Sequence, residues 1–125
     1  QPLAEIGDSA SAGVAPALMG IGPIAATERL LARTGFTLND FDVIEINEAF
    51  AAQVLATLQS WRIDFDDTRV NPNGGAIALG HPLGMSGARL VLSSALELHT
   101  RQLSNALVTM CVGVGQGVSL VIKAL

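Results

Sequence analysis

Residues 71–87, N-P-N-G-G-A-I-A-L-G-H-P-L-G-M-S-G, join a glycine-rich turn to a single histidine and then to the start of a helix. The glycines of this stretch let a backbone or a ligand approach closely; they are Gly74, Gly75, Gly80, Gly84 and Gly87. His81 lies between Gly80 and Pro82, where its ring can be held rigidly. A lone histidine is more often structural than catalytic, so its role depends on the polar residues that accompany it.

The composition is that of one globular domain over residues 1–125, long enough to bury a single core. Half of the residues are hydrophobic and 14% are charged, which excludes a disordered chain and favours an α/β or α+β domain. The net charge of -4 lacks the basic field that nucleic-acid binding requires. No apolar run reaches the roughly 18 residues of a membrane span, so we expect no membrane partner. The single cysteine excludes an internal disulfide, and we expect a cytoplasmic protein.

Strand-like and helical patterns alternate along the first half of the chain. Residues 3–6 and 10–14 predict one bent strand or two short ones. A helix is expected from Pro23 to about Thr34, with Ile24, Leu30 and Leu31 facing inward and Gly35 as its stop. Residues 43–46 predict a strand. A second helix, from Ala49, has one core-facing side formed by Phe50, Val54, Leu58 and Trp61.

The second half predicts a very short strand at Val70, a helix over about residues 85–98, and an antiparallel hairpin of strands 106–111 and 118–122. The helix is apolar around much of its circumference, through Leu90, Val91, Leu92, Ala95, Leu96 and Leu98. Such a helix is usually buried on most sides, so we expect a second layer from another domain or subunit to cover it. The order β-α-β-α-β-α-β-β predicts an α/β fold, a mixed sheet with helices on both faces.

Several common sites fail on residue type or spacing. Residues 75–80 have the spacing of a Walker loop, but His81-Pro82 replaces the Lys-Ser/Thr pair that grips phosphate. The glycines at 113, 115 and 117 precede a strand, whereas a dinucleotide fingerprint opens a helix. Residues 84–88 lack the last glycine of a nucleophile elbow, which leaves Ser86 as a small helix residue. Cys111, His81 and His99 are too few and too scattered for zinc, so we expect no metal.

Two further polar residues accompany His81 at predicted strand ends. Asn47 follows the strand 43–46, and Cys111 ends the strand 106–111 just before flexible glycines, which favours an accessible thiol. Polar groups at the strand ends of one open α/β sheet tend to gather at the same edge. Asn47, His81 and Cys111 together therefore indicate a site more strongly than each does alone.

These motifs together resemble the carboxy-terminal domain of thiolases, the acyl-CoA acyltransferases. The matching segments are NEAFAAQ at 47–53, NGGAIALGHP at 73–82 with SGAR at 86–89, C-x-G-x-G-x-G at 111–117, and MGIGP at 19–23. The resemblance covers essentially all 125 residues in family order. Local sequence is most similar to the β-ketoadipyl-CoA thiolases of aromatic-acid degradation.

The resemblance implies a role for each site residue in Claisen chemistry on coenzyme A thioesters, the substrates, with no tightly bound cofactor. His81, with a water held by Asn47, would form an oxyanion hole for the thioester oxygen. Cys111 would act as acid or base at the reacting carbon once its surroundings lower the pKa of its thiol. The Gly113 N–H would serve a second oxyanion hole. The acyl or pantetheine tunnel would be lined by Met19 and Phe50.

One departure from the family bears on what the chain can do alone. Thiolases carry the acyl group on a nucleophilic cysteine in an amino-terminal C-x-S-G-type motif, which these 125 residues lack. We therefore expect a domain that is inactive alone, with the nucleophile and most coenzyme A contacts in a missing amino-terminal domain, and we expect a homo-oligomer. Residues 101–105 also lack the glycine-basic turn that the family leads us to expect.

Two other functions compete with this interpretation. The related β-ketoacyl synthases pair two histidines with a cysteine, and Asn47 occupies one of those histidine positions, which disfavours that class. A non-catalytic interaction or lipid-binding domain that has kept a thiolase-like half is consistent with the missing nucleophile.

Overall fold

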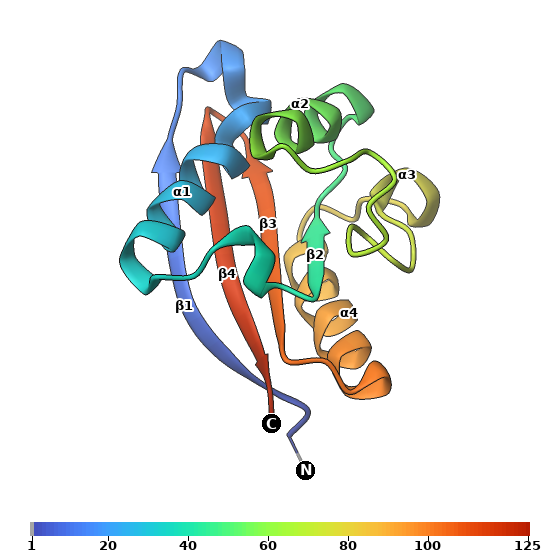
Figure 1. Cartoon of the computed structure of the whole chain (residues 1–125). Coiled ribbons are helices and arrows are strands. Elements are labelled where there is room, and N and C mark those ends of the chain that lie inside the picture. Colours follow the sequence, from blue (N-terminus) through green and yellow to red (C-terminus); the bar gives the residue numbers. More distant parts are fainter. Residues whose placement is uncertain (1) are drawn as a thin grey trace.

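Four strands form one mixed sheet in the computed structural model, which describes residues 2–125 (Figure 1). They are β1 (Ala4–Gly13), β2 (Val43–Ile46), β3 (Asn105–Val112) and β4 (Gln116–Ala124), in the order β1-β4-β3-β2. β4 pairs antiparallel with β1 and β3, and β2 pairs parallel with β3. β2 is buried along its whole length, as expected for a strand covered on both faces. The predicted α/β class, the strand at 43–46 and the hairpin are confirmed.

Two details of the predicted strands differ. β1 is a single bent strand, with a shift in its pairing to β4 between Ile6 and Ser9. The strand predicted at Val70 was wrong, because Val70 forms only one isolated bridge, to Ile44. The next residue, Asn71, has a φ of 44°, a left-handed conformation that ends extended structure. The observed order of strands and long helices is therefore the predicted one without its third strand.

One face of the sheet is covered by α1 (Gly22–Thr34) and α2 (Ala51–Trp61). Two short 3-10 helices flank α1: η1 (Pro16–Ile21) leads from β1 into α1, and η2 (Leu38–Asp40) leads from α1 to β2. α1 has a proline in its first turn and ends at Gly35, whose N–H bonds to the Leu31 carbonyl oxygen. The buried side of α1 consists of Ala26, Thr27 and Leu30. Ile24 and Leu31 were predicted to face inward and are only partly buried.

α2 starts two residues later than predicted, which moves Phe50 out of the core. Phe50 has extended backbone angles, φ -150° and ψ 144°, and its side chain is 63% exposed. The prediction of a core position was wrong because a residue before the first turn does not share the helix's rotational phase. Leu58 remains buried, and Val54 and Trp61 pack partly buried against the same cluster.

The other face is covered by α4 (Ser86–Arg101), which confirms helices on both faces (Figure 1). Leu90 and Leu98 of this helix are fully buried against the sheet, whereas Leu92 is 56% and Leu96 46% exposed. The second layer predicted over this outer side stays a prediction. A one-turn helix, α3 (Ala76–Leu79), precedes α4 and was not predicted, because four residues give no measurable periodicity.

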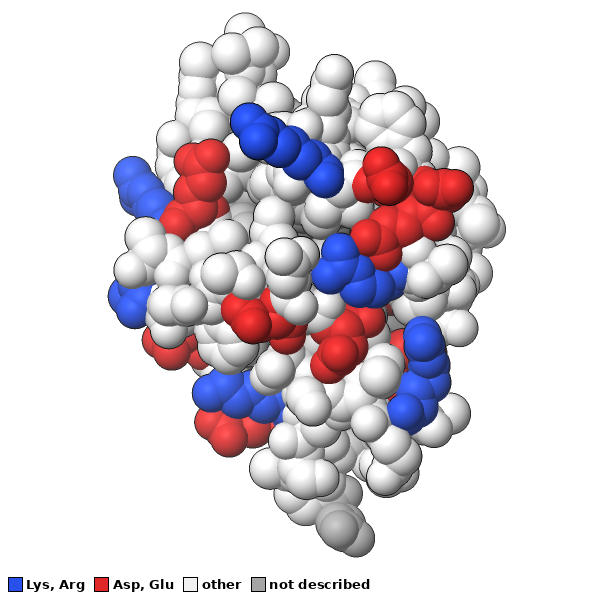
Figure 2. All heavy atoms as spheres, viewed as in Figure 1, with Lys and Arg blue, Asp and Glu red and all other residues white. Residues whose placement is uncertain are grey.

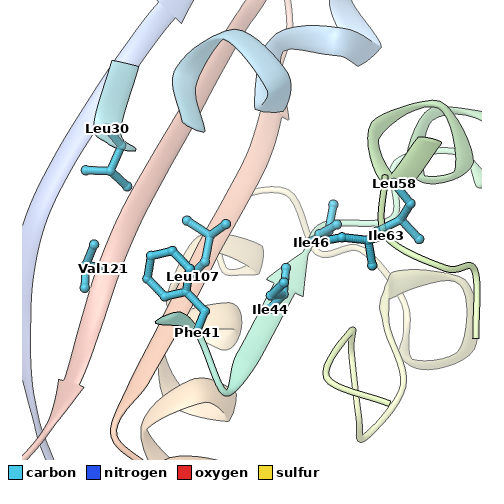
Figure 3. Close-up of a cluster of buried hydrophobic side chains, with 8 residues drawn as sticks. All are labelled: Leu30, Phe41, Ile44, Ile46, Leu58, Ile63, Leu107 and Val121. Carbon is cyan, nitrogen blue, oxygen red and sulfur yellow. The ribbon is translucent and has the colours of Figure 1, made fainter. Parts of the chain in front are cut away.

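The main hydrophobic core fixes β2 in position between α1, α2 and the neighbouring strands. Figure 3 shows its eight buried side chains; they are Leu30, Phe41, Ile44, Ile46, Leu58, Ile63, Leu107 and Val121. On the opposite face, Val43 packs in a second cluster with residues of α4. Because β2 is held from both faces, the residues that follow Ile46 leave the sheet at a defined point.

The described surface is mixed in charge. On the face seen in Figure 2, acidic and basic side chains are interspersed, and the basic side chains form no continuous patch. None of the helices within residues 2–125 has the length and apolar character needed to cross a membrane.

Candidate active site

Asn47 and His81 meet at the edge where β2 ends. The Asn47 N–H donates to the Thr109 carbonyl oxygen at 2.9 Å, which extends the pairing of β2 with β3 by one residue. The fully buried Asn47 side chain places its Nδ2 3.5 Å from the His81 Nε2. The structure thus brings together two of the residues that the sequence singled out, although 34 residues separate them.

The other ring nitrogen of His81 is held by Ser86, the first residue of α4. The Ser86 Oγ lies 2.5 Å from the His81 Nδ1 and 3.2 Å from the Pro82 carbonyl oxygen. The Asn47 Nδ2–H can only donate, so its hydrogen bond requires an Nε2 without a proton; the neutral ring then donates from Nδ1–H to the Ser86 Oγ, and the Ser86 hydroxyl donates to the Pro82 carbonyl oxygen. With the proton on Nε2, the Ser86 hydroxyl donates to Nδ1 and the hydrogen bond from Asn47 is lost. Either way, the ring orientation is fixed on one side by Ser86.

Ser86 is the residue whose role sequence reasoning missed. A Ser–His pair at this distance also suits a nucleophile and its base, but the Ser86 side chain is fully buried at a helix start. The geometry therefore supports a positioning contact. The signal that could have found it is the five-residue spacing from His81 across a proline into a helix start.

Cys111 lies at the same edge, near the end of β3, and is 5% exposed. Burial raises the pKa of its thiol. The expectation of an accessible thiol with a lowered pKa was therefore wrong for this chain, although Gly113 and Val114, just after β3, are exposed. Within residues 2–125, the Cys111 thiol forms no hydrogen bond with His81 or Asn47.

The glycines after Cys111 differ in what requires them. Gly117, which pairs with Cys111 across the hairpin, lies so close to Gly22 that a Cβ at position 117 would overlap the Gly22 carbonyl. This contact brings the start of α1 against the strand pair that contains Cys111. A Cβ at Gly113, in contrast, would meet nothing within 4 Å in the described chain. Packing explains Gly117, and it leaves the space beside Gly113 open.

The predicted tunnel residues belong to neighbouring elements. Met19 lies in η1 and is partly buried, and the adjacent Gly20 packs against the Gln53 side chain of α2. The exposed Phe50 immediately precedes α2. The segments that contain Met19 and Phe50 therefore lie side by side at one end of the domain (Figure 1).

A buried ion pair connects β2 to α4 just behind the site. Glu45 is fully buried, and its Oε2 lies 3.5 Å from the Nη1 of Arg89. Burial raises the pKa of the Glu45 carboxyl to about 7, although the Arg89 charge opposes this rise. Within the described residues, the second carboxyl oxygen of Glu45 and two nitrogens of Arg89 are buried without hydrogen-bond partners. The pair joins β2, which ends just before Asn47, to α4, which starts at Ser86.

Apolar side chains around His81 are exposed to an unusual degree. Ile77 and Leu79 of α3 are 66% and 58% exposed, and Leu83 is 82% exposed. An apolar groove of about 560 Å³ also runs between β1 and α4, lined in part by Leu3, Val91 and Leu92. Apolar surface of this extent is typical of a face that another protein layer covers.

Comparison with known proteins places this geometry in a family. The family description "Thiolase, C-terminal domain" matches residues 1–124. The 3-oxoadipyl-CoA/3-oxo-5,6-dehydrosuberyl-CoA thiolase of Escherichia coli (strain K12) is 57% identical over 122 residues, which are 98% of this chain and 30% of that protein. A beta-ketoadipyl-CoA thiolase of Pseudomonas knackmussii is 61% identical over 114 residues, 91% of this chain and 28% of that protein.

A solved structure agrees with these relatives. The crystal structure of the Bacillus anthracis acetyl-CoA acetyltransferase superposes with a TM-score of 0.95 at 46% identity, over 100% of this chain and 31% of that one. The chain thus spans about 30% of the length of the proteins it matches. The resemblance inferred from the sequence is confirmed, and the chain belongs to the family of thiolase carboxy-terminal domains.

Proposed function

We propose that this chain is the carboxy-terminal domain of an acyl-CoA thiolase, an acyltransferase that converts a 3-oxoacyl-CoA and coenzyme A into a shortened acyl-CoA and acetyl-CoA. The observation that carries the proposal is the Asn47–His81–Ser86 arrangement at the sheet edge. The names of relatives at 57% and 61% identity favour 3-oxoadipyl-CoA as the substrate.

His81 stabilises the negative charge that develops on the thioester oxygen. Its Nε2 points toward Asn47 at the open edge, and Ser86 fixes the ring from behind. The Oδ1 of Asn47 is buried without a partner within residues 2–125, so this amide has hydrogen-bonding capacity for the proposed water. Loss of one such oxyanion donor typically costs about 2.7–4 kcal/mol of barrier.

Cys111 transfers the proton at the carbon next to the thioester. In thiolysis, a thiolate of the amino-terminal domain attacks the 3-oxo carbon and the C2–C3 bond breaks. The electron pair passes into the enolate of acetyl-CoA, whose oxygen faces His81, and the Cys111 S–H gives its proton to C2. The coenzyme A thiol then gives its proton to the Cys111 thiolate, and its sulfur attacks the acyl-enzyme carbonyl, which forms the new acyl-CoA and returns the nucleophilic thiolate. Burial raises the pKa of Cys111, so at neutral pH the thiol retains the proton that an acid needs.

The remaining site residues complete the binding surface. The open space beside Gly113 is consistent with its N–H serving a second oxyanion hole. Met19 and Phe50 line the acyl or pantetheine tunnel from η1 and from the start of α2.

Residues 1–125 form one domain that is inactive alone, and the nucleophilic cysteine lies in an amino-terminal domain of the complete enzyme. The exposed apolar surface of α3 and α4 supports a protein layer over this face. The face seen in Figure 2 has no continuous basic patch for coenzyme A phosphates, which supports their contacts lying elsewhere. The complete enzyme is proposed to be a homo-oligomer.

The proposal is tested by replacing the carboxy-terminal 30% of the E. coli relative with this chain and measuring thiolysis of 3-oxoadipyl-CoA and acetoacetyl-CoA. We expect the hybrid to turn over substrate and to lose this activity on Cys111→Ala. We expect the isolated chain to show no turnover. A soluble hybrid that folds and does not turn over either substrate would refute the proposed activity.

A non-catalytic binding domain remains the second candidate. The observation that favours it is the burial of the Cys111 thiol together with the apolar groove between β1 and α4. Binding of a fatty acid to the isolated chain at micromolar affinity, with an inactive hybrid, would favour that function.

A further inference from the structure

Glu48, the residue after Asn47, connects the end of β2 to the segment that leads to His81. Its Oε2 accepts the backbone N–H of Ile77, in the first turn of α3, at 2.9 Å. Its Oε1 accepts the Asn71 side-chain Nδ2–H at 3.1 Å. One carboxylate therefore contacts both the start of the loop and the one-turn helix that ends immediately before Gly80 and His81.

Asn71 completes this connection on the strand side. Its Oδ1 accepts the Ile46 N–H at 2.8 Å, and its Nδ2 donates to the Ile46 carbonyl oxygen at 3.0 Å. The Asn71 amide thus makes the two hydrogen bonds that a strand continuing beyond Val70 would make. It satisfies both backbone groups of Ile46, the last residue of β2. The loop is anchored at the point where Asn47 leaves the sheet.

The Glu48 carboxylate packs against the backbone at Gly75. A Cβ at position 75 would overlap the carboxyl carbon and both carboxyl oxygens of Glu48, so the Glu48 head group packs directly on the glycine backbone. The φ of Gly75 is -113°, which any residue can adopt. A larger residue at position 75 would therefore displace the Glu48 carboxylate without straining the backbone.

We infer that Glu48 is a positioning residue that sets the distance between Asn47 and His81, and this inference rests on the proposed oxyanion hole. Asn47 and Glu48 are adjacent and act on different parts of the site. Asn47 contacts the His81 ring, and Glu48 holds segment 71–80, which positions this ring. Ser86 fixes the ring from the α4 side, so Glu48 and Ser86 hold His81 from its two flanking segments. Small displacements of such donors are costly, because about 1 Å of misplacement can lower a rate about 100-fold.

The experiment uses the hybrid thiolase that contains this chain, with Glu48→Ala, Glu48→Gln, Gly75→Ala and the double variant Glu48→Ala/Gly75→Ala. Glu28→Gln, an exposed glutamate on α1, controls for the loss of one acidic charge. Hydrogen–deuterium exchange of residues 72–85 reports the loop, exchange of 105–124 reports the sheet, and thiolysis gives kcat and KM separately.

For Glu48→Ala, we expect hydrogen–deuterium exchange of loop residues 72–85 to become at least about 10-fold faster, while exchange of sheet residues 105–124 stays unchanged. We expect kcat to fall about 10- to 100-fold with little change in KM. Glu48→Gln keeps one acceptor and the side-chain volume, so its effects are smaller. Gly75→Ala lowers kcat on the native background and has little further effect when Glu48 is alanine, because the overlap is gone.

Each arm can overturn the inference. Unchanged exchange in Glu48→Ala would show that Glu48 does not hold the loop. Faster exchange with unchanged kcat would show that the loop does not set the geometry of His81. Full additivity of the Glu48 and Gly75 substitutions would remove their proposed contact. If His81→Ala itself retains full activity, the proposed function fails, whereas the exchange arm still decides whether Glu48 holds the loop.

Discussion

Relative to the native chain, replacement of Glu45 by glutamine should become steadily more favourable to stability as the pH rises from 5 to 8. Glu45 is fully buried, with one weak contact to Arg89 at 3.5 Å and one carboxyl oxygen without a partner within the described residues. Burial is the largest cause that raises the pKa of this carboxyl from 4.5 to about 7; nearby Glu48 and Glu97 add to the rise, and Arg89 opposes it. The folded protein therefore favours the protonated, neutral form.

The sign and size of the effect follow from proton linkage. A carboxyl whose pKa is raised on folding contributes stability below its unfolded value of 4.5, and this contribution is lost as the pH rises through about 7. Each pH unit in this window corresponds to about 1.4 kcal/mol, so the total loss is about 3 kcal/mol. Glu45→Gln imitates the neutral form and avoids the loss. Its advantage over the native chain should grow by about 2–3 kcal/mol between pH 5 and pH 8.

Urea unfolding at pH 5, 6, 7 and 8, followed by the fluorescence of the single tryptophan, Trp61, measures this difference. Subtraction of the native curve from the Glu45→Gln curve cancels the groups that the two proteins share. Glu28→Gln controls for the loss of one negative charge. A difference that stays constant from pH 5 to pH 8, or that shrinks, would refute the assignment of Glu45 as a carboxyl destabilised by burial.

Two pairs of substitutions test the packing of the site. Ser86→Ala should lower the free energy of unfolding by about 1–3 kcal/mol and slow thiolysis, because it removes the contact to the His81 Nδ1. Ser94→Ala, on the same helix, should be neutral or stabilising, because it removes a buried hydroxyl without a partner in the described chain. Equal effects of the two would contradict this account. Gly117→Ala should lower the free energy of unfolding by about 3 kcal/mol or more, because the added Cβ overlaps Gly22. Gly113→Ala should change it by less than about 0.5 kcal/mol. The urea unfolding midpoints of the two variants measure the difference.

Sequence reasoning was most successful where local chemistry determines structure. Pro23 and Gly35 bracket α1 to within one residue, and the apolar run 43–46 is β2. It failed where the boundary depends on geometry beyond the pattern. Phe50 continues the spacing of α2 but precedes its first turn, and Val70 has a strand-like neighbourhood but is followed by the left-handed Asn71.

The sequence predicted that Asn47 and His81 lie together, but it did not predict the side chains that hold them; the roles of the candidate site residues stay predictions. Asn47 and His81 were grouped because strand ends of an open sheet share an edge, and the structure places them 3.5 Å apart. Ser86 and Glu48 escaped notice because their roles depend on contacts of single atoms, and the partners of Glu48 are 23 and 29 residues away. The burial of Cys111 depends on how tightly the hairpin and α1 pack, which the flexible glycines after it did not reveal.

Asn47 and His81 are proposed to act together as one oxyanion hole. The most direct test of this proposal is a double-mutant cycle for thiolysis in the hybrid enzyme, with Asn47→Ala, His81→Ala and both together. We predict that each single change lowers kcat about 100- to 1,000-fold, and that the double variant is about as impaired as the worse single one. Losses that multiply, or a His81→Ala enzyme that retains its kcat, would contradict the account.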